Sequence, residues 1–172
     1  MFDGIYFPRH ECAFLSVYVP EHNIVPGWSV GIPHDQMCCK KYSGCNDYFE
    51  VAVEAIGEMS RQTGKPTFDN DGHMQKGTVV RHLVLPSLYK DGIEAFTNLV
   101  KKVDPEDIAV SIMCQYFPTH LSEKYPEINR KTTTLEYMKV VDFVRTLGFR
   151  YGFMQEKESA KKEYVPKFDY GE

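Results

Sequence analysis

The segment from Lys76 to Pro86 is a continuous apolar run that carries one arginine and one histidine near its centre (KGTVVRHLVLP). A run of this kind, closed by proline, predicts a strand buried on both faces, as in a parallel sheet covered by helices. Because an unpaired buried guanidinium is costly, Arg81 must reach a carboxylate, a phosphate or the carboxyl edge of the sheet, where α/β folds bind ligands. Arg81 is therefore either a ligand-binding residue or the partner of a structural aspartate, and the strand alone leaves both readings open.

Charge and hydropathy argue against several classes of protein. The 172 residues carry a formal charge of -4, and the 20 Lys and Arg are spread among 24 Asp and Glu, which disfavours nucleic-acid binding. No apolar run approaches the ~20 residues of a membrane span, and the first residues lack the basic and apolar regions of a signal peptide. We therefore expect a cytoplasmic protein that does not insert into membranes, with its five cysteines reduced.

From residue 46 onward, the pattern alternates between helices and strands. Apolar spacing and capping residues predict helices from Asn46 to Gly64, over about 91–103, and from a capping box of Thr133 with Glu136 to Gly148. Strands are expected at 78–85, 107–113 and 149–154, with a further short one at 3–7, whereas 65–77 reads as a loop. This alternation predicts a parallel sheet with right-handed crossovers, either as an open sheet or as part of a barrel.

Most of the chain resembles one protein family. The motifs that carry the resemblance are YSGCNDYFEVAVEAIGEMSRQTGKPTFDNDGHMQKGTVVRHLVLP, VSIMCQYFP, YPEINRKTTTLEYMKVVDFVRTLGF and YGFMQEKESAKKEYVPKFDYGE, in that order. They closely resemble the C-terminal half of radical S-adenosylmethionine proteins related to pyruvate formate-lyase activating enzyme. The resemblance implies an α/β fold with parallel strands, a partial (β/α) barrel whose strands deliver ligand-binding residues at their carboxyl ends. It divides the chain into an irregular segment at 1–41, with one or two short strands, and a half-barrel at 42–172.

The resemblance also implies a cofactor site. The arginine that points toward the cofactor in these enzymes corresponds to Arg81, and positions near the adenine or ribose correspond to Gln115 and Tyr116. For the last two, packing at the end of a strand is the alternative. The side chain of His82 should point to the opposite face from Arg81, as a hydrogen-bonded packing residue.

The metal centre of the family is not represented in the sequence. These enzymes bind S-adenosylmethionine at an iron-sulfur cluster held by a Cys-x3-Cys-x2-Cys motif, and that spacing occurs nowhere in this chain. We therefore expect no catalytic and no metal-ligating residues here. The first quarter does contain soft ligands, but their spacing fits no zinc finger or ribbon, and coincidence is favoured over a zinc site: His10, Cys12, His22, His34, Cys38, Cys39 and Cys45.

Two hypotheses follow. In the first, the chain is a radical S-adenosylmethionine activating-enzyme homologue of the oxidoreductase class, truncated and inactive alone, for which the resemblance implies a glycyl-radical-type protein substrate. In the second, it is a non-catalytic half-barrel that serves as a binding or assembly module, as a homodimer or with a complementing half-barrel. In either case we expect the apolar stretch at 13–19 to cover an open edge of the sheet or to lie in a dimer interface.

Overall fold

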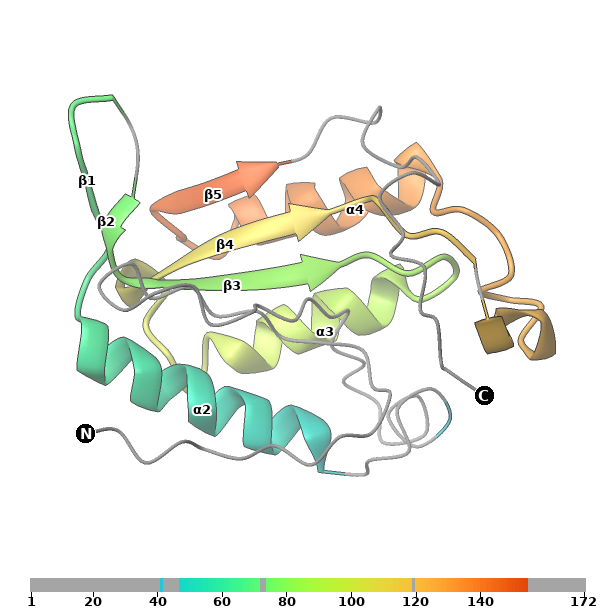
Figure 1. Cartoon of the computed structure of the whole chain (residues 1–172), viewed down its shortest axis with the longest axis horizontal. Coiled ribbons are helices and arrows are strands. Elements are labelled where there is room, and N and C mark those ends of the chain that lie inside the picture. The colour runs from blue at the N-terminus through green and yellow to red at the C-terminus, as the bar shows by residue number, and fades with distance from the viewer. Residues whose placement is uncertain (1–40, 42–46, 72–73, 119, 155–172) are drawn as a thin grey trace, which may run out of the picture.

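The computed structural model describes Lys41 and residues 47–71, 74–118 and 120–154 (Figure 1). The predicted strand at 3–7, the apolar stretch at 13–19 and the histidines and cysteines of the first quarter lie outside the described residues. The described part is a mixed α/β structure, as expected. None of its helices is both long enough and apolar enough to span a membrane.

A three-stranded parallel sheet forms the centre of the fold. Its strands are β3 (Thr78–Leu83), β4 (Ile108–Met113) and β5 (Tyr151–Met154), in the order β3-β4-β5. Both neighbouring pairs run parallel, with Thr78 opposite Ile108 and Ala109 opposite Tyr151. Helix α3 (Tyr89–Leu99) lies between β3 and β4 in the chain, and α4 (Thr134–Arg145) lies between β4 and β5. The predicted parallel pairing, with a helix between successive strands, is thus confirmed.

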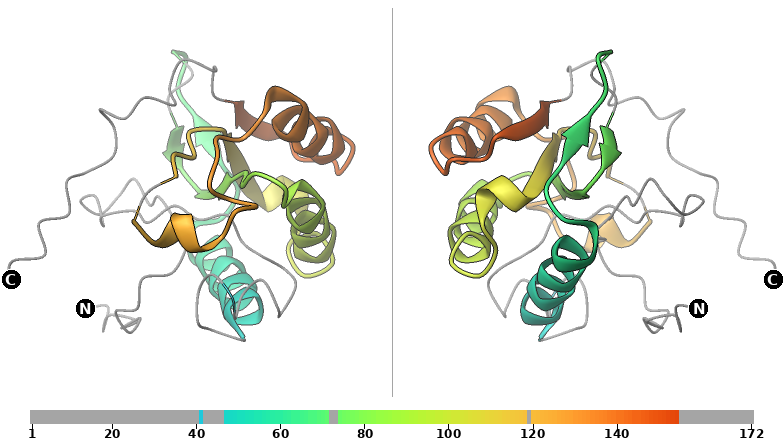
Figure 2. Two further views of the ribbon diagram at one scale, coloured as in Figure 1. Left: turned by 90° about the vertical axis from the view of Figure 1, so that its right-hand side faces the viewer. Right: turned by 90° about the vertical axis from the view of Figure 1, so that its left-hand side faces the viewer.

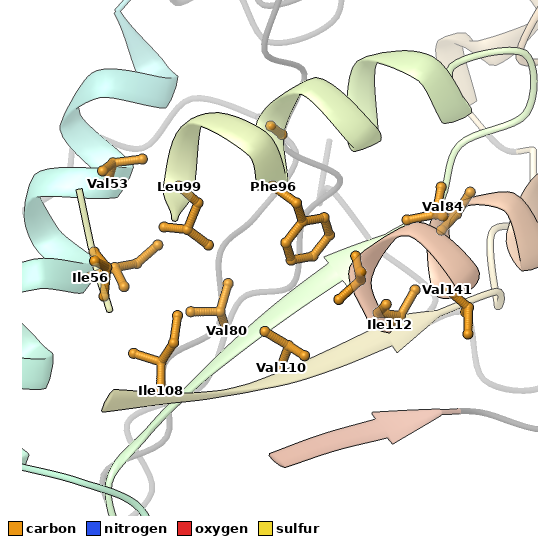
Figure 3. Close-up of a cluster of buried hydrophobic side chains, with 14 of the residues drawn as sticks. Val53, Ile56, Val80, Val84, Phe96, Leu99, Ile108, Val110, Ile112 and Val141 are labelled. Atoms are coloured by element: carbon orange, nitrogen blue, oxygen red, sulfur yellow. The ribbon is translucent and has the colours of Figure 1, made fainter. Parts of the chain in front are cut away.

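One face of the sheet and the helices enclose the core. Helix α2 (Tyr48–Thr63), α3 and α4 all contribute buried apolar side chains to this single cluster, and Figures 2 and 3 show their arrangement around the strands. Alternate residues of the strands complete it: Val80, Val84, Ile108, Val110 and Ile112. Because successive side chains of a strand alternate between faces, the intervening residues project from the other side of the sheet, here called the second face.

Strand β3 was predicted to be buried on both faces, but on the second face it is less buried than expected. Residues Thr78 to Val80 are buried, but Arg81 and Leu83 are only half-buried. The three helices share one core, so the expected helical cover on both faces is wrong for the described residues. Part of the second face is instead covered by a short hairpin.

That hairpin lies where the sequence predicted a loop. It consists of β1 (Thr67–Phe68) paired antiparallel with β2 (Met74–Lys76). The ring centroid of Phe68 lies 4.6 Å from that of Tyr151 and 6.3 Å from that of Phe153, so β1 packs onto β5. Strands of two and three residues are too short to leave a periodic pattern in the sequence, which is why they were missed.

Two helix ends follow their predicted capping signals, and two differ from the prediction. Gly64 ends α2 with a φ of +68°, a left-handed conformation that glycine adopts without strain. Both hydrogen bonds of the predicted capping box between Thr133 and Glu136 are present at the start of α4. The N-cap of α2 is Asp47, which makes no side-chain capping bond, rather than the predicted Asn46. Helix α3 ends at Leu99, earlier than the expected 103.

His82 lies on the core side of β3. Its side chain is 4% exposed, and its ring meets Phe96 of α3 edge to face, with 5.1 Å between the ring centroids. The predicted packing role is therefore confirmed, but Nδ1 does not make the hydrogen bond that was expected of this side chain, because it has no partner within the described part of the chain. Burial lowers the pKa of His82 to about 4, which keeps the imidazole neutral near pH 7.

Replacing Gly92 by alanine should lower the free energy of unfolding by about 1–2 kcal/mol, although alanine normally stabilises a helix interior by about 0.8–1 kcal/mol relative to glycine. A Cβ at Gly92 would lie 2.8 Å from Nε2 of His82, whose buried ring has little room to move. The matched control is Gly57→Ala on α2, where the added Cβ would lie 3.9 Å from Val103. Urea unfolding should show the two substitutions acting in opposite directions, and equal stabilisation by both would refute the close contact.

Candidate functional site

Two of the three predicted site residues meet at the carboxyl edge of the sheet. Arg81 projects from β3 on the second face, and its Nη2 donates a hydrogen bond to the sulfur of Met113 at 3.0 Å. The amide Nε2 of Gln115, two residues beyond the end of β4, lies 3.9 Å from the same sulfur. The Met113 sulfur thus brings a guanidinium and an amide from neighbouring strands to one point.

The chemistry of this pair suits a ligand with negative charge and hydroxyl groups. A guanidinium presents five N–H donors in a planar fork that matches carboxylate or phosphate oxygens, and an amide offers both a donor and an acceptor. A thioether is a weak, uncharged acceptor, so the Met113 contact orients Arg81 and adds no charge of its own. The half-buried position of Arg81 would strengthen its attraction for an anion relative to a fully exposed arginine.

Tyr116, the third predicted site residue, is not bonded to the other two. Its side chain is half-buried, and burial raises the pKa of the Tyr116 phenol above its usual value, so the hydroxyl is neutral near pH 7. Within the ranges that the structure describes, Tyr116 makes no hydrogen bond to Arg81 or Gln115. The next residue, Phe117, lies beneath the ammonium of Lys131, with 5.3 Å from Nζ to the ring centroid. The structure therefore groups Arg81 with Gln115, and Tyr116 shares no hydrogen bond with either of them.

The described residues do not fit an iron-sulfur cluster. A cluster of the radical S-adenosylmethionine type needs three thiolates, whereas Cys114, which is half-buried, is the cysteine that the described ranges contain. Within the same ranges, no group of three or more His, Cys, Asp and Glu side chains converges to hold a metal ion. We therefore assign no step to a cluster at this site.

A second polar group at the same edge centres on the carboxylate of Glu136. Arg130 approaches it in a bidentate manner, with Nη2 2.6 Å from Oε1 and Nη1 2.9 Å from Oε2. The backbone N–H of Ser87 donates to Oε1 at 2.7 Å, and the backbone N–H and hydroxyl of Thr133 donate to Oε2 at 2.9 and 2.7 Å. Five donor contacts thus satisfy one buried carboxylate, and we call these four residues the Glu136 network.

The Glu136 network joins the end of β3 to the start of α4. Arg130 is the main reason that the pKa of Glu136 lies well below its usual range, and the donors on Thr133 and Ser87 add to this effect. Ser87 follows the apolar strand in a left-handed conformation, with a φ of +66° that is unusual for a residue other than glycine. Its hydroxyl accepts from Arg130 at 3.0 Å and donates to the carbonyl of Glu127 at 3.1 Å, so its conformation is held by the network.

The sequence revealed only part of this network. The spacing of Thr133 and Glu136 indicated the capping box, but Arg130 and Ser87 were not singled out. Arg130 lies six positions before Glu136, and Ser87 lies 49 positions before it, so neither falls at a helical spacing from the glutamate. The one sequence feature that pointed weakly to Ser87 is its place directly after Pro86, where the apolar strand ends in a turn.

A cavity at the opposite, amino edge of the sheet is less suited to a ligand. Its volume is about 380 Å³, and it lies between the C-terminal ends of α2 and α3. The cations Arg61 and Lys65 line it, but they are already paired with Glu58 at 2.6 Å and Glu106 at 3.1 Å. A third lining cation, Lys102, is accompanied there by the carboxylates of Asp104 and Asp107. Because these charges balance each other, the carboxyl edge remains the candidate site.

Comparison of the chain with protein-family models, with curated proteins and with solved structures finds no match.

Proposed function

We propose that the chain is a radical S-adenosylmethionine protein of the pyruvate formate-lyase activating enzyme type, formed by the C-terminal half of the (β/α) barrel and inactive without a cluster-binding half. The observation that supports this most is the convergence of Arg81 and Gln115 at the carboxyl edge of a parallel sheet. They project from the face opposite to the helices. In a (β/α) barrel that face is the interior, and ligands bind at its carboxyl end.

Each residue has a role in this proposal. The Arg81 guanidinium binds the carboxylate or the ribose hydroxyls of S-adenosylmethionine, and the Gln115 amide contacts the ribose or the adenine. Half-buried Tyr116, the residue after Gln115, offers an aromatic surface to the adenine. The iron-sulfur cluster that activates the cofactor in this family would have to come from another segment or another chain. A glycyl-radical-type protein substrate and a cytoplasmic location belong to the same proposal.

Titration calorimetry with S-adenosylmethionine tests this assignment. We expect the full chain to bind the compound, and Arg81→Met, which keeps an unbranched apolar side chain beside Met113, to weaken binding by about tenfold or more. A hydrogen bond to a charged group contributes about 1.5–3 kcal/mol, which corresponds to this factor. The matched control is Arg150→Met, because Arg150 is an exposed arginine outside the site. Gln115→Leu should cause a smaller loss, since its hydrogen bonds are neutral.

Three outcomes would contradict the proposal. If the chain did not bind S-adenosylmethionine, or bound it equally well with Arg81→Met, the carboxyl edge would not be the cofactor site. If anaerobic incubation of the isolated chain with iron, sulfide, dithionite and S-adenosylmethionine released 5′-deoxyadenosine above a protein-free control, an unrecognised set of cysteines would bind the cluster, and the chain would not be inactive alone.

A second candidate function is a non-catalytic half-barrel that acts as an assembly module. One observation favours it, because β5 at the side of the sheet exposes Phe153 and Met154, with 42% and 52% of their surfaces accessible. This function requires no cofactor. It therefore predicts association without S-adenosylmethionine binding, whereas the first candidate predicts binding that depends on Arg81.

A further inference from the structure

Ser111 of β4 lies on the second face, next to Arg81. Val110 and Ile112 on either side of it belong to the core, so Ser111 projects from the opposite side of the sheet. In the pairing of β3 with β4, the Cα partner of Ser111 is Arg81. Neighbouring strands of a sheet are about 4.8 Å apart, so these two side chains leave the sheet as direct neighbours.

The hydroxyl of Ser111 is available for a ligand. Ser111 is half-buried, and its side chain makes no hydrogen bond within the part of the chain that the structure describes. The Arg81 guanidinium leans toward the carboxyl edge, where it donates to the sulfur of Met113, two residues further along β4. Met113 is fully buried, whereas Ser111 is not. A group that can both donate and accept therefore remains beside the arginine.

Ser111 is also a small residue between two large ones. The strand pairing places Arg81, Ser111 and Phe153 at one level of the second face, across β3, β4 and β5 (Figure 1). Phe153 is exposed, and its ring lies 6.3 Å from that of Phe68. Ligand sites commonly combine apolar walls with a few polar groups that fix the orientation of the ligand. This level of the sheet offers a cation, a hydroxyl and an aromatic ring in that order.

We propose that Ser111 is a further ligand-binding residue of the carboxyl-edge site. Its hydroxyl hydrogen-bonds the oxygen-bearing group of S-adenosylmethionine that Arg81 also binds, and its small size leaves room for the compound above β4. This inference rests on the proposed function and adds to it a residue that determines affinity. The group is either the carboxylate or the ribose hydroxyls, since a guanidinium donates to both and a serine hydroxyl can bond to both.

Substitutions at position 111 separate the hydroxyl from the size of the side chain. In titration calorimetry of the full chain with S-adenosylmethionine, Ser111→Ala should weaken binding roughly threefold to tenfold, the effect of one lost hydrogen bond. Ser111→Leu should weaken it by about tenfold or more, because it also fills the space above β4. Ser111→Thr keeps the hydroxyl and should bind more tightly than Ser111→Ala, although threonine is larger than alanine.

Thr97 provides the matched controls. It is a half-buried hydroxyl residue of α3, on the other side of the sheet, so Thr97→Ala and Thr97→Leu should leave the dissociation constant unchanged. Circular dichroism confirms that each variant is folded. A parallel titration with 5′-methylthioadenosine, which has the ribose but no carboxylate, identifies the group. Loss of affinity for this compound with Ser111→Ala assigns the ribose, whereas an unchanged affinity, or no binding of the compound, assigns the carboxylate.

The outcomes distinguish this inference from the proposed function. If Arg81→Met weakens the binding of S-adenosylmethionine and Ser111→Leu does not, Ser111 is not part of the site, and the proposed function stands. If Ser111→Ala binds more tightly than Ser111→Thr, size alone matters, and the proposed hydrogen bond is wrong. If the unmodified chain does not bind the compound, the proposed function fails and this inference fails with it.

Discussion

Replacing Glu136 by alanine should lower the free energy of unfolding by about 3 kcal/mol. The substitution removes the acceptor for Arg130, Ser87 and Thr133 together, and it leaves partly buried donors without this partner at both the end of β3 and the start of α4. Hydrogen bonds to a charged group contribute about 1.5–3 kcal/mol, and a helix N-cap about 1 kcal/mol. The expected loss is smaller than the sum of these contributions, because the Arg130 side chain is 42% exposed and solvent screens its attraction to the carboxylate.

Urea unfolding monitored by circular dichroism would measure this loss. Thr133→Ala is the matched control, since it removes one donor and the capping hydroxyl but keeps the ion pair, and it should cost only about 1 kcal/mol. If the two substitutions were equally mild, Glu136 would serve as a helix cap alone and would not join β3 to α4.

The same carboxylate predicts a loss of stability in acid. Its pKa is held well below the usual range in the folded protein, mainly by Arg130, so the folded state binds its proton less readily than the unfolded chain. The stability that Glu136 contributes is therefore fully present above about pH 4.3, the usual pKa of glutamate, and falls as the pH drops below that value. Glu136→Gln keeps the size of the side chain and cannot titrate, so this part of the pH dependence should disappear.

The second large effect concerns His82 and a higher pH range. Its folded pKa of about 4 lies below the usual 6.5, so between these values the unfolded chain binds a proton that the folded chain does not. Stability from this group is fully present above about pH 6.5, and it should fall as the pH decreases toward about 4. The shift corresponds to a loss of about 3 kcal/mol over that range, since each pKa unit is worth about 1.4 kcal/mol.

His82→Leu isolates this effect. Leucine is apolar and cannot be protonated, so the free energy of unfolding should no longer fall between about pH 6.5 and pH 4. Glu136→Gln is the control, because it should keep the His82 dependence and lose only the dependence at lower pH. A wild-type protein whose stability did not change across the upper range would show that the imidazole of His82 is not held neutral by burial.

His82 and Glu136 both stabilise the region around β3, but they do so through different contacts. His82 adjoins Arg81 in β3 but packs against α3 on the core side, whereas the Glu136 network holds the Ser87 turn that follows β3. Both therefore support the strand that carries Arg81 without touching the second face. Substitution of His82 or Glu136 should therefore lower the free energy of unfolding and leave the side chains of Arg81 and Gln115 in place.

Local patterns in the sequence were enough to locate most of the described elements. The alternation of apolar runs and capped helical spacing predicted α2, α3, α4 and the three parallel strands, because burial on one face imposes a repeat that can be read without the fold. The capping box of Thr133 and Glu136 was also foreseen, since its residues lie within one helical turn. Arg81 attracted attention because a charged residue stood within an apolar strand.

Only the tertiary structure decided how distant segments meet. Gln115 joins Arg81 through the Met113 sulfur, and Ser87 reaches Glu136 across 49 positions of sequence. Neither contact leaves a local repeat. The opposite-face position of His82 followed from the strand period, but its unsatisfied Nδ1 and its close approach to Gly92 depend on how α3 packs on β3. Periodicity fixes which face a side chain occupies, while the partner that it meets there is set by the packing of elements far apart in the chain.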